Sequence, residues 1–239
     1  MSEIKRAIIL AGGEGTRLRP VTLEIPKPLV SVQGEPILSW LVRLLAKHQI
    51  LRVSVIYPTE WEKKFEAWAS APHPIPVELL EERERMGTLG YLVHELETDD
   101  EPMLVVNGDV LNGLDLSRLM SFHANLAAVR PAYAASLALT PVPNPSEYGV
   151  AEMKGSLIAR FHEKPAEPPS NLINAGLYVL GSSVIQEVPR HSRHLMFETD
   201  LFPRLAAQGR LGGCALAGQW YDCGTLERWE SAIREWRGL

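Results

Sequence analysis

Short apolar runs recur along this chain, each followed by a loop that contains glycine or aspartate and then by a helical pattern. They occupy residues 7–10, 52–57 and 103–106, and β-branched and aliphatic side chains dominate them. Strands of this composition are typical of a parallel sheet that is covered on both faces. The order of elements predicts an α/β protein, a Rossmann-like three-layer α/β/α sandwich around a mostly parallel mixed sheet.

Apolar residues at helical spacing predict helices over residues 37–45, 89–96 and 225–236. Pro36 suits the first turn of one helix, and Thr88 suits the N-cap of another. The second half of the chain is richer in strands, predicted at residues 132–139, 149–153, 157–161 and 173–180. The proline clusters between them are interpreted as ordered loops, so we expect residues 1–239 to form a single catalytic domain.

The composition excludes several classes of protein. The net charge of −5, from 24 Lys and Arg against 29 Asp and Glu, is contrary to the broad basic face of a nucleic-acid-binding protein. The sequence holds no apolar stretch of membrane-spanning length and no signal-peptide core, which predicts a cytoplasmic protein that does not associate with membranes. Two cysteines are too few for a disulfide framework or a four-thiolate zinc site.

The segment Leu10-Ala-Gly-Gly-Glu-Gly-Thr-Arg-Leu-Arg-Pro20 directly follows the first predicted strand. Its glycines allow backbone N–H groups to approach an anion closely, as phosphate-binding loops require. It is not a Walker A loop, because no Gly-Lys-Ser or Gly-Lys-Thr occurs in the chain. It also fails the dinucleotide fingerprint, because Leu18 stands where the third glycine belongs and the second strand ends without an acidic residue.

Three cations follow the glycines within a short distance. They are Arg17, Arg19 and Lys27. Lys27 lies between two prolines, which restrict its backbone. Such a set can neutralise a triphosphate and a second phosphate. The alternative interpretation is a tight turn that carries solvated surface charges, and the whole run from residue 10 to residue 30 argues against it.

This run resembles the signature of sugar-1-phosphate nucleotidylyltransferases, also called NDP-sugar pyrophosphorylases. The resemblance covers nearly the whole chain. Further segments that resemble the family are Met86-Gly-Thr-Leu-Gly90, Asn107-Gly-Asp109, Glu147-Tyr-Gly-Val150, Phe161-His-Glu-Lys-Pro165, Asn174-Ala-Gly176, Phe197-Glu-Thr-Asp-Leu-Phe-Pro203 and Trp220-Tyr-Asp-Cys-Gly224. The resemblance implies the nucleotide-diphospho-sugar transferase fold and a Mg²⁺-dependent reaction of an NTP with a sugar 1-phosphate, which gives an NDP-sugar and pyrophosphate.

The resemblance also implies roles for individual residues. Asp109 and Asp222 would hold Mg²⁺, and the residues expected to act in catalysis are Arg17, Lys27, Asp109 and Lys164. The nucleotide would bind Leu10, Ala11, Gly12, Gly13, Gly15, Thr16, Arg17, Gly87, Thr88 and Asn107. The sugar phosphate would bind Lys27, Tyr148, Gly149, Glu163, Lys164, Asn174 and Glu198.

Several of these residues have a plain structural alternative. Asp109 suits a turn after Asn-Gly, Asp222 suits a helix terminus ahead of Thr225, and Thr88 suits an N-cap. Lys164 suits a solvated charge beside a loop proline and Asn174 suits an amide satisfied within its strand, and a purely structural role is likewise the alternative for Glu198. Two further predictions are negative: His191 and His194 lie in a solvated loop rather than a metal site, and Cys223 is a packing residue.

The motifs look most like guanylyltransferases that act on mannose or manno-heptose 1-phosphate in nucleotide-sugar biosynthesis. Leu89 departs from the family pattern after Gly-Thr, so uridylyltransfer to an amino-sugar or hexose phosphate and cytidylyltransfer stay open as alternatives. Two other classes are an NAD-type oxidoreductase, which the failed fingerprint disfavours, and a non-catalytic nucleotide-sugar sensor, which would not need both carboxylates. The chain ends soon after Gly224, so we expect no C-terminal β-helix, and a homo-oligomer stays open.

Overall fold

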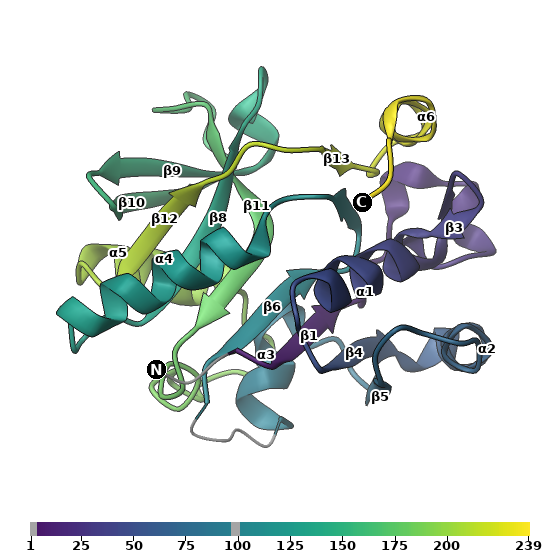
Figure 1. The fold of residues 1–239 in the computed structure, drawn as a ribbon, viewed down its shortest axis with the longest axis horizontal. Helices are drawn as coiled ribbons and strands as arrows, with labels where there is room; N and C mark the ends of the chain where they lie inside the picture. Colours follow the sequence, from purple (N-terminus) through teal and green to yellow (C-terminus); the bar gives the residue numbers. More distant parts are fainter. Residues whose placement is uncertain (1–3, 97–100) are drawn as a thin grey trace. The chain divides into compact units, whose positions relative to one another are not determined.

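The structure, a computed structural model, describes residues 4–96 and 101–239 and comprises two compact units (Figure 1). The Gly-loop unit consists of residues 5–85, 106–114 and 218–239. Of the described residues, the strand-rich unit comprises 4, 86–96, 101–105 and 115–217. Both units are discontinuous in sequence, and strand β6 (Met103–Asn107) runs from the strand-rich unit into the Gly-loop unit. That residues 1–239 act as one catalytic domain stays a prediction.

Three parallel strands form the centre of the Gly-loop unit in the order β5-β4-β1. They are β1 (Arg6–Leu10), β4 (Arg52–Pro58) and β5 (Val77–Glu82). The middle of β1 is fully buried, as its unbroken apolar run predicts. Helices α1 (Ile37–Lys47) and α2 (Glu62–Ala69) supply further apolar side chains to the core. All three parallel strands end at the same edge, which is the edge where the Gly-rich loop begins.

Two short antiparallel ribbons complete the Gly-loop unit. One pairs β2 (Ser31–Val32) with β3 (Glu35–Pro36). The other pairs β7 (Val110–Asn112) with β13 (Trp220–Asp222), and helix α6 (Leu226–Glu235) follows (Figure 1). The second ribbon matters for the site, because it brings chain segments more than a hundred residues apart into register, with Asp222 opposite Val110.

The strand-rich unit orders its strands β11-β8-β12-β10-β9. Strands β8 and β12 pair in parallel, whereas β10 pairs with β12 and β9, and β11 pairs with β8 and β9, in antiparallel fashion. The bounds are β8 (Ala135–Pro141), β9 (Gly149–Lys154), β10 (Leu157–Glu163), β11 (Leu172–Leu180) and β12 (Leu211–Ala215). Its helices are α3 (Gly87–His94), α4 (Leu116–Val129) and α5 (Phe202–Ala207), and α4 crosses in front of β8 and β12 in Figure 1.

Short turns of other helical types occur between these elements. They are 3₁₀ turns at Thr16–Leu18, Val21–Leu23, Lys27–Leu29, Thr59–Trp61 and Pro145–Glu147, and a π-helical turn at Phe197–Leu201. One difference from the sequence prediction concerns Thr88. Helix α3 begins at Gly87, so Thr88 lies inside the first turn and its side chain makes no cap.

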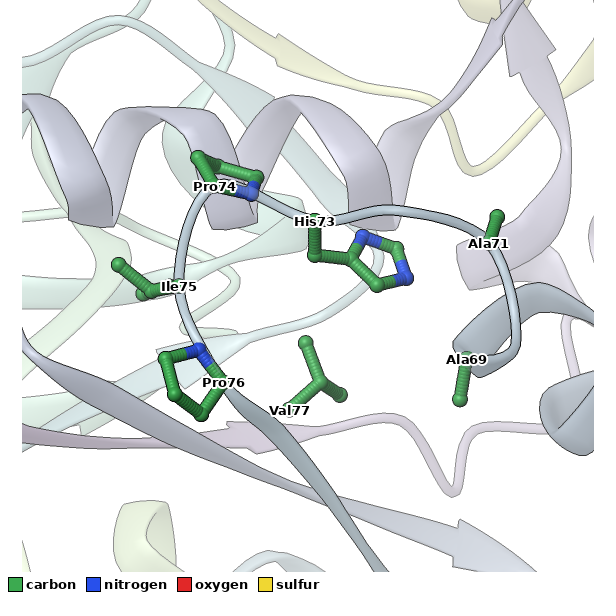
Figure 2. A pocket seen from close by; sticks show the side chains of 7 residues that line it. All are labelled: Ala69, Ala71, His73, Pro74, Ile75, Pro76 and Val77. Carbon is green, nitrogen blue, oxygen red and sulfur yellow. The ribbon is translucent and has the colours of Figure 1, made fainter.

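The loop between α2 and β5 curves around a shallow hollow of about 360 Å³ (Figure 2). His73 turns into it, with its Nε2 3.0 Å from the carbonyl oxygen of Trp68 and its ring 4.5 Å from the indole ring centre. The other lining residues are Ala69, Ala71, Pro74, Ile75, Pro76 and Val77. Apart from His73 the lining side chains are apolar, and none of them is a lysine or arginine, so the hollow is not a candidate site for a triphosphate.

Candidate active site

The Gly-rich loop leaves the end of β1 and is fixed by backbone hydrogen bonds. The Ala11 N–H donates to the carbonyl oxygen of Ile56 at 2.8 Å, which ties the loop to the neighbouring strand. Gly15 has a φ of 60°, and the Thr22 hydroxyl donates to its carbonyl oxygen at 2.8 Å. A Cβ at Gly15 would lie only 2.9 Å from Cγ2 of Thr22, so both conformation and space require glycine there.

Lys27 lies in the 3₁₀ turn that follows this loop and is only 5% exposed. Its Nζ donates to Oδ2 of Asp109 at 2.9 Å and to Oδ1 of Asp222 at 3.3 Å. Burial by itself lowers the pKa of Lys27, but the two carboxylates outweigh it and hold the pKa of this ammonium above its ordinary value. The lysine is therefore charged at neutral pH.

Asp109 reaches Lys27 because its loop packs against the end of β1. The Gly108 N–H donates to the carbonyl oxygen of Leu10 at 2.8 Å. A Cβ at Gly108 would lie 2.8 Å from the same oxygen, so only glycine permits this close approach. The apolar strand, the glycine and the aspartate therefore act together to place Asp109 beside the Gly-rich loop.

Asp222 is placed by the β7–β13 ribbon and is held by a second cation. Arg228, in the first turn of α6, donates from Nη1 to Oδ2 of Asp222 at 2.8 Å. Thr225 is the N-cap of this helix, since its side chain accepts the Arg228 N–H at 3.3 Å. Sequence reasoning missed Arg228 because its role depends on a tertiary contact. Asp222 thus has each of its oxygens beside a different cation.

Asp109 and Asp222 together offer hard oxygen ligands to a divalent cation. Oδ2 of Asp109 and Oδ1 of Asp222 both point at the Lys27 ammonium, so they already converge on one point. Mg²⁺ is commonly held by one or two carboxylates plus phosphate oxygens and water, so the donor set fits it. In the part of the chain that the structure describes, no group of three or more His, Cys, Asp or Glu side chains could hold a metal.

The other cations and loop residues of the prediction are placed as follows. Arg17 is exposed, and its Nη2 lies 3.2 Å from where a Cβ of Gly224 would stand, which places it near Asp222. Leu10, Gly12 and Asn107 are half-buried and Ala11 is buried, whereas Gly13, Thr16 and Arg19 are exposed. The structure therefore brings Arg17, Lys27, Asp109 and Asp222 together in the Gly-loop unit.

Two residues near Gly12 were missed in the sequence. Glu82 ends β5, is 7% exposed, and has its Oε2 2.8 Å from where a Cβ of Gly12 would stand. Arg85 donates from Nη1 to the Gly12 carbonyl oxygen at 3.1 Å and from Nη2 to Glu60 at 2.6 Å. A buried carboxylate beside a glycine loop is a functional signal, but the position of Glu82 depends on the parallel pairing of β5 with β4.

In the strand-rich unit, Thr88 and Glu198 form one polar cluster. The Thr88 hydroxyl donates to Oε2 of Glu198 at 2.9 Å and accepts the Phe197 N–H at 2.9 Å. Burial raises the pKa of Glu198, and the hydrogen bonds from its own backbone N–H and from the Thr88 hydroxyl only partly offset this effect. This contact replaces the capping role predicted as the alternative for Thr88.

A second cluster joins residues 148–149 to residues 163–164. The Lys164 N–H donates to the Tyr148 carbonyl oxygen at 3.1 Å, and Lys164 Nζ lies 3.4 Å from Oε1 of Glu163. Gly149 is required because a Cβ there would overlap the Phe161 ring and approach Oε2 of Glu163 at 3.2 Å. Lys164 has a φ of 45°, a left-handed conformation that strains a non-glycine residue. Its ammonium extends into solvent, with 65% of the side chain exposed.

The remaining candidates have simple surroundings. The Asn174 amide bonds the Tyr178 hydroxyl and the Gly176 N–H, both at 2.9 Å, within a bulge of β11. This matches the structural alternative for Asn174, and its sugar contact stays a prediction. His191 and His194 are exposed. Cys223 is fully buried, and burial raises the pKa of its thiol to about 12, which agrees with a packing role.

Comparisons with known proteins agree with this geometry. A family model described as "Nucleotidyl transferase" matches residues 6–237. The mannose-1-phosphate guanylyltransferase catalytic subunit beta of Danio rerio is 37% identical over 228 residues, which cover 92% of this chain and 61% of that protein. The mannose-1-phosphate guanylyltransferase of Mycobacterium tuberculosis is 35% identical over 230 residues, with the same two shares. The chain thus spans 61% of the length of these relatives.

Two solved structures share the fold. One is a Bacillus anthracis protein provisionally identified as a glucose-1-phosphate thymidylyltransferase, with a TM-score of 0.84, 24% identity, and coverage of 98% of this chain and 96% of that one. The other is an apo UDP-glucose pyrophosphorylase with a TM-score of 0.76, 20% identity and coverage of 97% of both chains. These likenesses confirm the predicted α/β class and the nucleotide-diphospho-sugar transferase fold. Within residues 4–96 and 101–239, no helix has the length and apolar character needed to cross a membrane.

Proposed function

Because the chain belongs to the nucleotidyl transferase family, we propose that it joins GTP to a mannose-type sugar 1-phosphate and releases pyrophosphate. The observation that carries the proposal is the Lys27 ammonium held between Asp109 and Asp222 at the end of a Gly-rich loop. This arrangement combines a phosphate loop, a buried cation and two oxygen ligands in one unit, which a dinucleotide-binding oxidoreductase does not need. A binding module would not need both carboxylates.

The chemistry requires charge neutralisation more than proton transfer. The attacking phosphate oxygen of the sugar phosphate is already mostly ionised at neutral pH, since the second pKa of a phosphate monoester is about 6. No general base is therefore needed, and the main barrier is repulsion between two polyanions and charge on the departing pyrophosphate. Lys27 would bridge the α-phosphate and the sugar phosphate, Arg17 would bind the β- and γ-phosphates, and Lys164 would bind the sugar phosphate.

The oxygen of the sugar phosphate attacks the α-phosphorus, and the bond from that phosphorus to the β-phosphate oxygen breaks. Asp109 and Asp222 would hold a Mg²⁺ ion, which when bound supplies positive charge next to the phosphate oxygens. The charged Lys27 and Arg17 would stabilise the same developing charge, and the burial of Lys27 makes its interaction stronger than in water.

Sugar recognition would fall to the strand-rich unit. Glu163 and Glu198 are carboxylates that can accept hydrogen bonds from sugar hydroxyls. The Thr88 hydroxyl fixes Oε2 of Glu198, which orients this carboxylate. Gly149, Tyr148 and Asn174 are further proposed contacts, and Asn174 would have to share an amide that the strand bulge already uses.

Glu82 favours guanine among the bases. The proposed base and ribose pocket includes Ala11 and Gly12, and the buried Glu82 carboxylate lies directly beside Gly12. Guanine presents two adjacent donors, its N1–H and 2-amino group, and a carboxylate is an acceptor that can take both. Uracil and thymine present a single N–H between two carbonyls, so a carboxylate suits them less well.

A substitution at Glu82 tests this preference. Glu82→Gln keeps the shape but turns one acceptor into a donor, so kcat/KM for GTP should fall about 10- to 100-fold, the cost of an unpaired buried group, while that for UTP falls less. Glu81→Gln is the matched control, because the neighbouring Glu81 instead accepts a hydrogen bond from Thr59. Equal losses of kcat/KM for GTP and UTP in Glu82→Gln would contradict the proposal that Glu82 selects guanine.

The cellular setting and assembly belong to the proposal as well. Cys214 and Cys223 are both buried thiols, which suits the reducing cytoplasm where nucleotides and sugar phosphates are available. A homo-oligomer stays a prediction.

A pyrophosphate-release assay over a grid of substrates tests the proposed function. GTP, UTP, CTP and dTTP are each combined with mannose, manno-heptose, glucose and amino-sugar 1-phosphates in the presence of Mg²⁺. We expect the highest kcat/KM for GTP with mannose or heptose 1-phosphate. A maximum with UTP or CTP would favour the uridylyl- or cytidylyltransferase alternative, and no release from any pair would refute nucleotidyl transfer.

A further inference from the structure

Lys27 lies where a cation between the two aspartates would lie. Its Nζ is 2.9 Å from Oδ2 of Asp109 and 3.3 Å from Oδ1 of Asp222, and the side chain is almost completely buried. The two carboxylates come from chain segments more than a hundred residues apart, so their convergence on one ammonium is a feature of the fold. Two carboxylates that converge without a cation would repel each other.

The second oxygen of Asp222, Oδ2, is already bound by another side chain. Arg228 binds Oδ2 at 2.8 Å, so Oδ1 is the oxygen turned toward Lys27. A divalent cation shared by Asp109 and Asp222 would therefore take Oδ1 of Asp222, the oxygen that the Lys27 ammonium holds. The ammonium and the metal therefore compete for this oxygen and for the position between the two carboxylates.

Resting on the function proposed above, we propose that Lys27 is a positioning residue that holds the two metal-binding aspartates together in the metal-free protein, and that a divalent cation displaces its ammonium. The displaced Nζ regains the two N–H donors that the aspartates occupied, so all three of its N–H groups can donate to phosphate oxygens. Metal binding and release of this lysine for its phosphates are then one event, so the enzyme acquires its principal cation only when the metal is present.

If the ion pair were merely structural, removal of the lysine would have the opposite effect on metal affinity. If Lys27 only stabilised the loop, its loss would disturb the aspartates and weaken metal binding. If Lys27 occupies the position of the metal, its loss removes a competing charge and strengthens metal binding. The sign of the change in metal affinity therefore separates the two roles.

The test measures Mn²⁺ binding to the whole chain without nucleotide, from the free Mn²⁺ signal in electron paramagnetic resonance. Lys27→Met keeps most of the unbranched side chain and removes its charge, and we expect it to bind Mn²⁺ at least about tenfold more tightly than the unmodified protein. Lys27→Arg keeps the charge and should not show this gain. In the double variant Lys27→Met/Asp222→Asn the gain should disappear. Equal or weaker Mn²⁺ binding by Lys27→Met overturns the proposal.

A second measurement does not depend on the folding of a variant. A crystal structure of the unmodified protein soaked in Mn²⁺ should show Mn²⁺ between Asp109 and Asp222 and Nζ of Lys27 beyond hydrogen-bond distance of at least one of them. Nζ still bonded to both carboxylates with Mn²⁺ bound to them would overturn the proposal.

Neither measurement uses turnover, so the two proposals can fail separately. A protein that forms GDP-sugar but whose Lys27→Met variant binds Mn²⁺ no more tightly contradicts this inference alone. Tighter binding by Lys27→Met in a protein that releases no pyrophosphate contradicts the proposed function alone.

Discussion

Gly108 is the residue on which the position of Asp109 depends, and Gly108→Ala tests that dependence. The added Cβ would lie 2.8 Å from the Leu10 carbonyl oxygen and 3.0 Å from Cγ2 of Ile9. Ile9 is fully buried and Leu10 ends the same strand, β1, so neither atom can yield easily. Because carbon and oxygen usually approach no closer than about 3.4 Å, the loop must move outward by roughly 0.6 Å.

This movement should have two measurable effects. Overpacking of this kind costs about 1–3 kcal/mol, so the free energy of unfolding in urea should fall by that amount. Asp109 is the next residue, and displacement of a reacting group by less than 1 Å can cost about 10- to 100-fold in rate, so kcat for pyrophosphate release should fall correspondingly.

Gly13→Ala is the matched control for stability, because a Cβ at Gly13 would meet nothing within 4 Å. Its free energy of unfolding should stay unchanged or rise slightly. If Gly108→Ala were as stable as the unmodified protein and released pyrophosphate at the same rate, the tight contact between β1 and the Asp109 loop would not position the aspartate.

Two further predictions concern titratable groups. Burial raises the pKa of Glu198, so the folded protein binds this proton more tightly than the unfolded chain does. The contribution of Glu198 to the free energy of unfolding therefore favours the folded state below the unfolded pKa of 4.5, and it is lost as the pH rises through the raised pKa of the folded state. Glu198→Gln should therefore gain stability over the unmodified protein in urea unfolding at pH 8 and lose most of that gain at pH 4, and an equal gain at both pH values would contradict this. Burial also raises the pKa of Cys223 to about 12, so neither Cys223 nor the buried Cys214 should react with iodoacetamide at pH 8 until urea is added. Alkylation of folded Cys223 within minutes, detected by mass spectrometry, would contradict its burial.

The elements predicted from sequence are those whose pattern is dictated locally. The runs that became β1, β4 and β6 are buried on both faces, so nearly every residue in them is apolar. Strand β12 was missed because it reads Leu-Gly-Gly-Cys-Ala, a poor strand sequence by propensity. The structure gives the reason: a side chain at Gly212 would overlap the Tyr133 hydroxyl, a contact between residues far apart in sequence.

Helix α4 was missed for a different reason. Its buried positions include Leu116, Leu119 and His123, so a histidine interrupts the apolar face. His123 is accommodated because its Nδ1 lies 3.0 Å from the Ser136 hydroxyl, and burial lowers its pKa to about 4, which keeps the ring neutral. The partner of His123 lies on strand β8, so the sequence of the helix alone does not reveal why a histidine can be buried there.

The same distinction applies to the site. Lys27, Asp109 and Asp222 could be selected from the sequence because each lies within a segment that resembles the family. Arg228 and Glu82 could not, since the first matters through its contact with Asp222 and the second through the pairing of β5 with β4. The link between Lys27 and both aspartates, on which the further inference rests, is visible only in three dimensions.

The most direct test of nucleotidyl transfer uses a sugar 1-phosphate labelled with ¹⁸O on its non-bridging phosphate oxygens. Attack of one of these oxygens on the α-phosphorus of GTP places the whole label in the GDP-sugar and leaves the released pyrophosphate unlabelled, which mass spectrometry can determine. We expect this distribution, and we expect Asp109→Asn to form neither product at a comparable rate. Label in the pyrophosphate, or no GDP-sugar at all, would contradict the account.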